Sequence, residues 1–194
     1  PSRLLIEKPI KDEFLEKLIE YSKPWMPNDP FHPDTAMGSM VDKAQTARVL
    51  DYIETGKTEG AEIIAGGKQV NKDSGGYYIE PTIFKNVNNN MRIAREEIFG
   101  PVLSTIEFDG ADQALEIAND TDYGLNAMIW SNDLNKVHKI AKRIKSGKVL
   151  INSMSDGDMS VPHGGYKQSG FGRDKSLEAM GQYTQTKLTW IELK

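Results

Sequence analysis

The alternation of strand-like and helix-like segments between residues 102 and 152 constrains the fold of this chain more than any other feature. Three short apolar runs, at 102–108, 125–130 and 148–152, have the length and composition of buried strands. Between them, apolar residues recur at helical spacing. They are Ala111, Ala114, Leu115 and Ala118 in the first helix and Leu134, Val137, Ala141 and Ile144 in the second, which Gly147 should end as its C-cap. This order predicts parallel βαβ units, and hence an α/β fold with a mostly parallel sheet flanked by helices.

The part of the chain before residue 102 shows a looser version of the same alternation. Residues 23–39 contain four prolines and should be irregular. In the rest, we expect strands at 3–8 and 61–65, helices at 10–21 and 40–58, and an extended segment at 77–87. The inward-facing candidates of the second helix are Val41, Ala44, Ala47 and Tyr52.

Composition excludes several classes of protein. A chain of 194 residues suits one domain. Its 24 basic and 28 acidic residues are interspersed, so we expect no basic face that could bind a nucleic-acid backbone. No apolar run approaches the ~20 residues of a membrane span. The chain has no cysteine, and its three histidines lack the spacing of metal ligands. We therefore expect a cytoplasmic protein with no metal, nucleic-acid or membrane partner.

The sequence predicts a strand without a partner at the end of the chain. Residues 186–193 have the composition of a strand that carries Leu188 and Trp190, and no later element could pair with them. An unpaired strand of this kind needs a partner, which another copy of the chain can supply. We predict a body at 1–183 and an assembly strand at 184–194, with homo-oligomers formed through residues 186–193.

The segment Arg95-Glu96-Glu97-Ile98-Phe99-Gly100-Pro101 carries the groups best suited to holding a nucleotide. Glu97 has two acceptor oxygens that match the paired hydroxyls of a ribose. Phe99 offers a flat face to a ring such as nicotinamide. Gly100 allows close approach of the backbone, and Pro101 can start a strand. The alternative is a plain helix end followed by a strand, with Phe99 in the core.

A second motif, Val161-Pro162-His163-Gly164-Gly165-Tyr166-Lys167-Gln168-Ser169-Gly170-Phe171-Gly172-Arg173, is rich in glycine. Its spacing matches neither the P-loop nor the dinucleotide-binding fingerprint, so we interpret it as a tight loop that needs positive φ angles. Together the two motifs resemble the closing half of the aldehyde dehydrogenase superfamily. The resemblance implies that Glu97 and Phe99 hold the nicotinamide riboside of NAD or NADP, and that Lys167 and Arg173 are structural.

Two further cofactor-binding candidates come from the same resemblance. Gln45 and Arg48 lie three positions apart on the second predicted helix. In the family, side chains at the matching positions can reach the adenosine ribose of the cofactor. A solvated helix face is the alternative for both residues.

The resemblance also implies that residues 153–162 face the substrate, with Ser155, Asp156, Asp158 and His163 as the candidate contacts. Asp156 and Asp158 could attract an amino group on the substrate. Acids beside a glycine more often hydrogen-bond the turn itself, and we favour that interpretation. His163 stands where the family usually carries Phe, and adds polarity. The Asp-Gly-Asp-Met run and the glycine-rich motif most resemble the γ-glutamyl-γ-aminobutyraldehyde dehydrogenases, which are polyamine-catabolic members.

The family performs its chemistry with a cysteine, and this chain has none. In the family, a Gly-Gln-x-Cys segment lies directly before a Ser-Arg pair like Ser2-Arg3. The resemblance therefore places no catalytic residue in this chain. The nucleophilic Cys, the general-base Glu, the oxyanion-hole Asn and an N-terminal cofactor domain are all expected upstream. The intact enzyme should oxidise a small-molecule aldehyde, an ω-aminoaldehyde derivative, to the acid through a thiolate adduct. The chain alone should be inactive.

Two rival interpretations belong to other functional classes. The chain could be a natural non-catalytic binding or assembly module that kept the fold without the nucleophile. It could also be a stand-alone nucleotide-binding domain, although Glu97 and Phe99 supply only half of a cofactor site. Binding of NAD to the chain alone would favour the stand-alone domain over the other interpretations.

Overall fold

The computed structural model describes residues 2–155 and 158–194. The chain divides into two compact units, Pro1–Ile117 and Ala118–Lys194. The division falls within the residues of helix α4 (Gly110–Asn119). Asp156, one of the residues predicted to face the substrate, lies outside the described residues.

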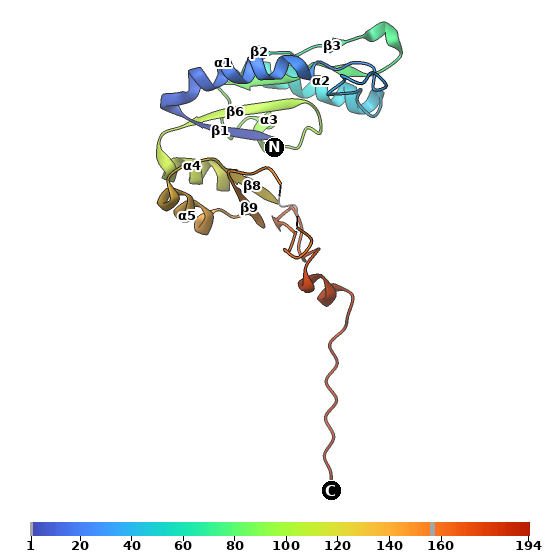
Figure 1. Ribbon diagram of the computed structural model, residues 1–194, viewed down its shortest axis with the longest axis vertical. Coiled ribbons are helices and arrows are strands. Elements are labelled where there is room, and N and C mark those ends of the chain that lie inside the picture. Colours follow the sequence, from blue (N-terminus) through green and yellow to red (C-terminus); the bar gives the residue numbers. More distant parts are fainter. Residues whose placement is uncertain (1, 156–157) are drawn as a thin grey trace. The chain divides into compact units, whose positions relative to one another are not determined.

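The first unit is built on a four-stranded sheet with the strand order β1-β6-β5-β2. Strands β1 (Arg3–Glu7) and β5 (Thr82–Lys85) run parallel to β6 (Val102–Phe108) on either side of it. Strand β2 (Glu62–Ala65) joins the far side of β5 in the antiparallel sense. The mostly parallel sheet predicted from the sequence is therefore confirmed (Figure 1).

The first unit also contains helices, 3₁₀ turns and a small hairpin. Helix α1 (Lys11–Ser22) is flanked by the 3₁₀ turns η1 (Lys8–Ile10) and η2 (Lys23–Trp25), and short α3 (Arg92–Arg95) precedes the Glu-Ile-Phe-Gly-Pro segment. A small hairpin and one more turn complete the unit: β3 (Gln69–Val70), η3 (Lys72–Ser74) and β4 (Tyr78–Ile79). Beyond η2, residues 26–42 contain no helix or strand, as their prolines predict.

Helix α2 (Lys43–Thr58) begins three residues later than predicted, because the Asp42 side chain caps it by accepting a hydrogen bond from the Gln45 backbone N–H. The face of α2 that packs on the core carries Thr46, Val49, Tyr52, Ile53 and Gly56. The inward placement of Tyr52 is confirmed. The same prediction for Val41, Ala44 and Ala47 is wrong, since all three are exposed.

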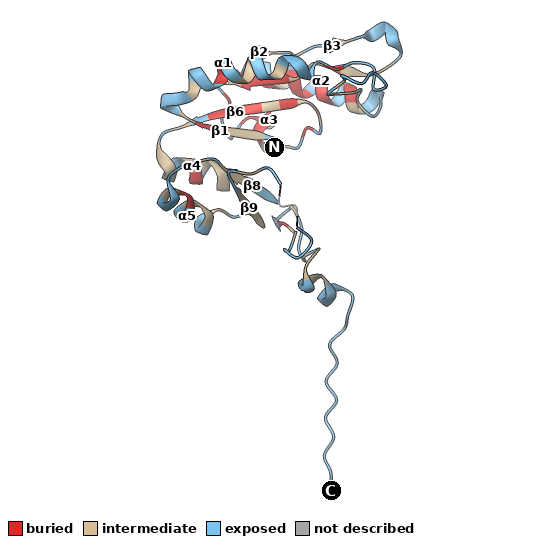
Figure 2. Ribbon diagram, viewed as in Figure 1, coloured by how far each residue is buried: buried red, intermediate tan, exposed pale blue. Residues whose placement is uncertain are grey.

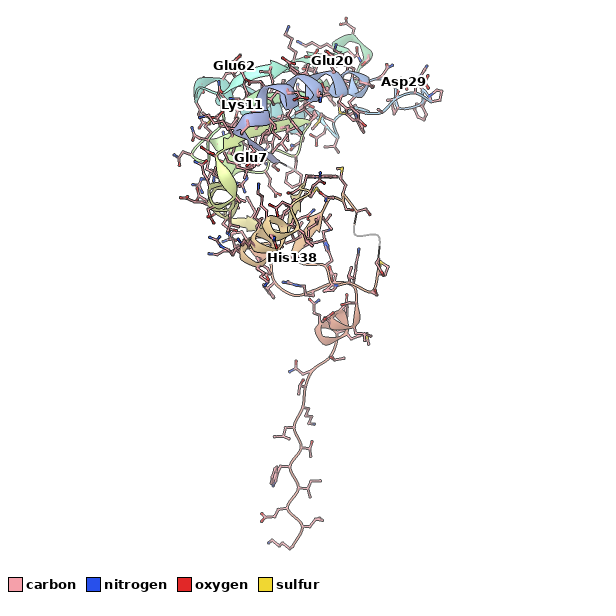
Figure 3. All side chains as sticks on the ribbon, turned by 60° about the vertical axis from the view of Figure 1, so that its left-hand side comes forward. Glu7, Lys11, Glu20, Asp29, Glu62 and His138 are labelled. Atoms are coloured by element: carbon pink, nitrogen blue, oxygen red, sulfur yellow. The ribbon has the colours of Figure 1, made fainter. Side chains whose placement is uncertain are left out.

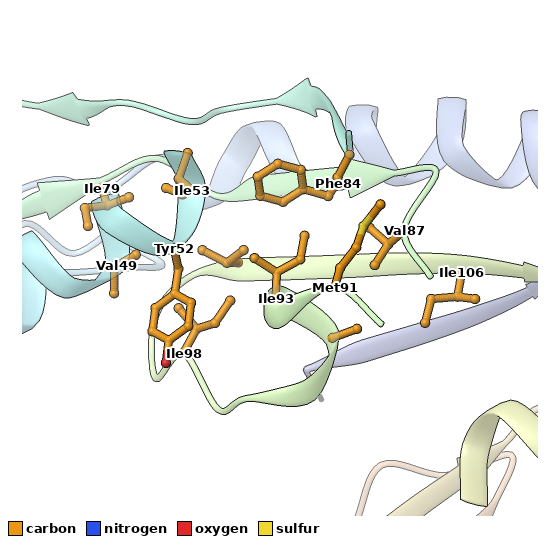
Figure 4. Close-up of a cluster of buried hydrophobic side chains, with 13 residues drawn as sticks. Val49, Tyr52, Ile53, Ile79, Phe84, Val87, Met91, Ile93, Ile98 and Ile106 are labelled. Atoms are coloured by element: carbon orange, nitrogen blue, oxygen red, sulfur yellow. The ribbon is translucent and has the colours of Figure 1, made fainter. Parts of the chain in front are cut away.

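The core of the first unit lies between α2, α3 and strands β4, β5 and β6 (Figure 4). Tyr52 from α2, Phe84 from β5 and Ile93 from α3 are each 0% exposed at its centre. The other members are Val49, Ile53, Ala61, Ile79, Val87, Met91, Ala94, Ile98, Val102 and Ile106. Because Ile98 belongs to this core, the core reaches directly into the segment that carries Glu97 and Phe99.

The second unit contains one of the two predicted βαβ units. Strands β8 (Asn126–Ile129) and β9 (Lys148–Ile151) are parallel and are joined through α5 (Leu134–Arg143), as predicted. The other predicted unit, which would join β6 through α4 to β8, is not formed, because β6 and β8 belong to different sheets. Both edges of β6 are already paired with β1 and β5, so no edge remains for β8.

The rest of the second unit consists of short elements. Strand β7 (Tyr123–Gly124) pairs with β10 (Tyr166–Lys167), and η4 (Leu177–Gln182) follows. Helix α5 ends at Arg143 with Ile144 as its C-cap, so the prediction that Gly147 caps it is wrong. His138 is exposed on α5 (Figure 3).

The end of the chain, residues 184–194, contains no helix or strand (Figure 2). Its apolar side chains are largely exposed, with Leu188 at 84% and Trp190 at 85%. A strand is defined by hydrogen bonds to a neighbouring strand, and no partner chain is present. The assembly strand and the division at residue 183 therefore stay predictions. Among the described residues, no helix has the length and apolar character needed to cross a bilayer.

Candidate cofactor site

The Glu-Ile-Phe-Gly-Pro segment turns Phe99 outward. Its ring is 74% exposed, so the alternative that placed Phe99 in the core is wrong. Its φ of 52° lies in the left-handed region, which is uncommon for a bulky residue and marks a strained position. Glu97 is exposed as well, whereas Ile98 between them is buried. The segment therefore offers a carboxylate and a flat ring to a ligand.

Gly100 is required by close packing against α2. A Cβ added at this position would lie 2.6 Å from Val49 Cγ2, which is closer than carbon atoms can approach. The predicted role of Gly100 in close backbone approach is confirmed. The Val102 N–H then donates to the Gly100 carbonyl at 2.8 Å, which turns the chain directly into β6.

Gln45 holds the backbone of this segment. Its side-chain amide donates to the Ile98 carbonyl at 2.8 Å and to the Phe99 carbonyl at 3.1 Å. Arg48 is exposed; its guanidinium donates to the Tyr52 hydroxyl at 3.3 Å and lies 5.6 Å from the centre of that ring. The structure thus brings Gln45 to the predicted cofactor segment. The contact of both residues with the adenosine ribose stays a prediction.

A cluster around Glu96 was missed in the sequence. One carboxylate oxygen accepts from the Tyr52 hydroxyl at 2.6 Å, and the other accepts from Arg92 Nε at 2.9 Å. The Arg92 guanidinium also lies 4.5 Å from the centre of the Tyr52 ring. The Tyr52 hydrogen bond, followed by that of Arg92, holds the pKa of the Glu96 carboxyl below its usual value. The signal available was the inward position of Tyr52 on α2.

This cluster makes stability depend on pH. We expect Tyr52→Phe to lower the free energy of unfolding near neutral pH by about 1 kcal/mol, because a hydrogen bond to a partly exposed carboxylate is lost while ring packing is kept. Since the folded-state pKa of Glu96 is depressed, its stabilisation is present above the ordinary glutamate pKa and is lost as the pH falls through the folded-state value. The difference between variant and parent should therefore shrink on acidification.

Urea unfolding over a series of pH values measures this difference. Tyr21→Phe is the matched control, because its ring is 77% exposed on another helix, α1, and the variant should unfold like the parent. A Tyr52→Phe effect that is constant from neutral to acid pH would contradict the contact with an ionised Glu96.

In the second unit, the predicted substrate loop is tied to its own backbone. The Asp158 carboxylate accepts from the Ser160 N–H at 2.8 Å, and the pKa of Asp158 is lowered by that bond, by the Ser160 hydroxyl and by the charge of Lys175. The turn-forming interpretation is therefore confirmed for Asp158. The Ser155 N–H donates to Ser153 Oγ at 3.2 Å, so this residue too takes part in a local turn.

His163 lies at the base of this loop. Its backbone N–H and carbonyl pair with Asp174, at 2.8 and 2.7 Å. Its Nδ1 atom is buried and has no hydrogen-bond partner among the residues that the structure describes. The roles of Ser155, Asp158 and His163 toward a substrate stay predictions.

The glycine-rich motif folds as a structural loop, as predicted. Gly170 and Gly172 have φ angles of 96° and 86°, whereas Gly164 and Gly165 are required by backbone atoms that a Cβ would approach to 2.5 Å. The Lys167 ammonium donates to the carbonyls of Asn119 and Thr121 at 2.7 and 2.8 Å. Arg173 donates to the carbonyls of Gly165 and Gly172. Lys167 and Arg173 thus hold backbone in place.

Comparison with known proteins agrees with this geometry. The model of the aldehyde dehydrogenase family matches residues 1–189. The chain belongs to this family. Aldehyde dehydrogenases similar to it include the NADP/NAD-dependent PuuC of Escherichia coli (strain K12), which is 44% identical over 193 residues covering 100% of this chain and 38% of PuuC.

Solved aldehyde dehydrogenases have the same fold. Indole-3-acetaldehyde dehydrogenase AldA of P. syringae, in complex with NAD⁺ and IAA, matches with a TM-score of 0.95 and 54% identity, over 99% of this chain and 39% of that one. γ-Glutamyl-γ-aminobutyraldehyde dehydrogenase of Burkholderia cenocepacia J2315 matches with a TM-score of 0.91 and 49% identity, over 95% and 37%. The chain thus spans 37–39% of the length of these relatives.

Proposed function

We propose that this chain works as the C-terminal part of the catalytic unit of a longer NAD(P)-dependent aldehyde dehydrogenase. The observation that carries the proposal is the outward Phe99 ring beside the outward Glu97 carboxylate, on a segment anchored in the core. An exposed aromatic ring held in a strained backbone conformation serves no packing purpose in this unit. A planar ligand with an attached sugar explains both side chains.

The residues present fit a nicotinamide dinucleotide. Phe99 would cover the nicotinamide ring and Glu97 would accept hydrogen bonds from the ribose hydroxyls. When bound, NAD⁺ or NADP⁺ supplies the hydride acceptor of the oxidation. This chain would bind and orient the cofactor, and the nucleophile would come from sequence that precedes it, because the chain has no cysteine.

For the substrate, we propose an ω-aminoaldehyde derivative, as in polyamine catabolism. The similarity to γ-glutamyl-γ-aminobutyraldehyde dehydrogenase of Burkholderia cenocepacia J2315 supports this class. So does the polar character of the loop residues Ser155, Asp158 and His163. Indole-3-acetaldehyde is the competing substrate, because the P. syringae enzyme is 54% identical to this chain.

We propose that the exposed segment 186–193 pairs with a second copy of the chain. The apolar side chains of Leu188, Trp190, Ile191 and Leu193 are each at least 75% exposed. Burying them in an oligomer would remove a large apolar surface from water. The same segment would serve a natural non-catalytic assembly module, which is the second candidate function for a chain without a cysteine.

The proposal is tested with the reading frame that contains this chain, including any coding sequence that precedes residue 1. We expect that sequence to encode a Gly-Gln-x-Cys segment, and the resulting protein to reduce NAD⁺ in the presence of γ-glutamyl-γ-aminobutyraldehyde. The 194-residue chain alone should give no turnover. In the longer protein, Phe99→Ala should raise the KM for NAD⁺ by about tenfold or more, because the ring contact is lost.

Phe31→Ala is the matched control, since Phe31 is 92% exposed in the proline-containing segment and has no part in the proposed site. A reading frame that begins at residue 1, with no turnover, would favour the non-catalytic assembly module. Turnover in which Phe99→Ala leaves the KM for NAD⁺ unchanged would remove the cofactor site from this segment.

A further inference from the structure

The segment Glu96–Phe99 alternates between two sides. Glu96 has an extended backbone, with φ −108° and ψ 154°, directly after the end of α3. Phe99 is left-handed, so this segment is not a regular strand, and its two sides are given by the exposure and contacts of its side chains. Glu96 reaches inward to Tyr52, Glu97 is exposed, Ile98 is buried and Phe99 is exposed. The two outward side chains are the proposed cofactor ligands, and the two inward ones are their supports.

Both ends of this segment are tied to one face of α2. Tyr52 holds the start through the Glu96 carboxylate, and Gln45 holds the end through the Ile98 and Phe99 carbonyls. Gln45 and Tyr52 are seven positions apart, which is two helical turns, so they lie on the same face. A rigid helix therefore sets the distance between the two anchors.

The start anchor is itself fixed from several directions. Arg92, which holds the second oxygen of Glu96, donates its backbone N–H to Glu59 at 2.8 Å and lies 3.4 Å from an oxygen of Asp51. The Tyr52 ring is fully buried. Glu96 directly follows α3 and directly precedes Glu97. Its carboxylate is held by a core tyrosine and by an arginine that is itself tied to two other acidic residues.

We propose that Glu96 is a positioning residue of the cofactor site: its carboxylate, held by Tyr52 and Arg92, fixes the segment so that Glu97 and Phe99 keep their outward placement. This inference rests on the proposed cofactor role of Glu97 and Phe99. Phe99 occupies a strained left-handed conformation, which persists only where its surroundings impose it. Without the Glu96 anchor, the segment would spend most of its time in other conformations.

The expected effect on cofactor binding follows from the smaller fraction of molecules in the binding-competent conformation. If only about a tenth of the molecules present the ring and carboxylate correctly, the apparent affinity for the cofactor falls about tenfold. Glu96→Ala should therefore raise the KM for NAD⁺ about tenfold and leave the KM for the aldehyde unchanged. Glu96→Gln retains an acceptor oxygen for the Tyr52 hydroxyl and should rescue most of the loss. A role in stability alone would lower the amount of active protein without changing either KM.

Two measurements test the proposal. Amide hydrogen exchange across residues 96–100 of the full 194-residue chain reports the anchoring without any reference to catalysis. The KM for NAD⁺ and for the aldehyde in the longer protein report the consequence for the cofactor. Glu54→Ala is the matched control, because the Glu54 carboxylate is also held by a side chain of α2, that of Lys57 at 2.8 Å, and is no part of the Glu96 cluster. Glu96→Gln also covers the case in which Glu96→Ala does not fold.

Faster exchange in Glu96→Ala together with a raised KM for NAD⁺ supports the proposal. Unchanged exchange overturns it, whatever the kinetics show. Faster exchange with an unchanged KM for NAD⁺ overturns the positioning role of Glu96, and the Phe99→Ala variant decides separately whether the cofactor binds at Phe99. If exchange is unchanged in Glu96→Ala while Phe99→Ala still raises the KM for NAD⁺, the proposed function stands and only the role of Glu96 is overturned.

Discussion

Gly147→Ala should lower the free energy of unfolding of the second unit by about 3 kcal/mol, the upper part of the range for overpacking. A Cβ at residue 147 would lie 1.8 Å from the Gly164 carbonyl oxygen and 3.2 Å from Gly165 Cα. These are backbone atoms, which cannot move aside as a flexible side chain could. Gly165 is itself crowded by Ser169, so the loop has no room to retreat. The expected result is displacement of the whole glycine-rich loop from the start of β9.

Urea unfolding followed by circular dichroism measures the change. Gly181→Ala is the matched control within the same unit, because a Cβ there meets no atom within 4 Å and its φ is not positive. That variant should differ from the parent by less than about 0.5 kcal/mol. If the two variants unfold at the same urea concentration, residue 147 does not pack against Gly164 in solution.

Phe84→Ala should have a comparable or larger effect on the first unit, about 4 kcal/mol of unfolding free energy. The Phe84 side chain is 0% exposed at the centre of the core, and its ring is close enough to Gly56 that a Cβ there would lie 3.0 Å away. Truncation would leave a cavity between α2 and β5 that the surrounding backbone cannot close. The loss should also loosen Ile98, which belongs to the same core.

Thermal and urea unfolding of Phe84→Ala and Phe31→Ala give the comparison. Phe31 is 92% exposed, so its truncation should change the free energy of unfolding by less than about 0.5 kcal/mol. Similar losses in the two variants would mean that the first unit does not have the core described for it.

Local patterns predicted most elements but not how they combine. The periodicity of residues 111–118 and 134–144 predicted α4 and α5, because burial of one helix face imposes that spacing. The same alternation suggested one continuous set of βαβ units. Strand pairing is decided by which edges are free, and β6 has none after it pairs with β1 and β5. That competition is invisible in the order of elements.

Of the residues in the Glu96–Phe99 segment, the sequence suggested a role for the exposed Glu97 and Phe99 but not for Glu96. Glu97 and Phe99 were suggested by their chemistry and by the family resemblance, which needs no contacts. Glu96, by contrast, carries the same type of side chain as Glu97 and differs only in which way the backbone turns it. Its partners, Tyr52 and Arg92, lie 44 and 4 positions away, and only the packing of α2 against α3 brings them together.

The inward and outward alternation of Glu96–Phe99 has a consequence for how this part of the chain can vary. Substituting a single residue alters one contact, whereas inserting or deleting one residue shifts every residue between the Tyr52 and Gln45 anchors. A deletion after Glu97 would remove the buried position of Ile98 and leave the Gln45 amide facing the wrong carbonyls. Because the two anchors on α2 are a fixed two turns apart, the helix cannot adjust to a shorter or longer segment. The number of residues in this segment is therefore under tighter physical constraint than the identity of any one of them.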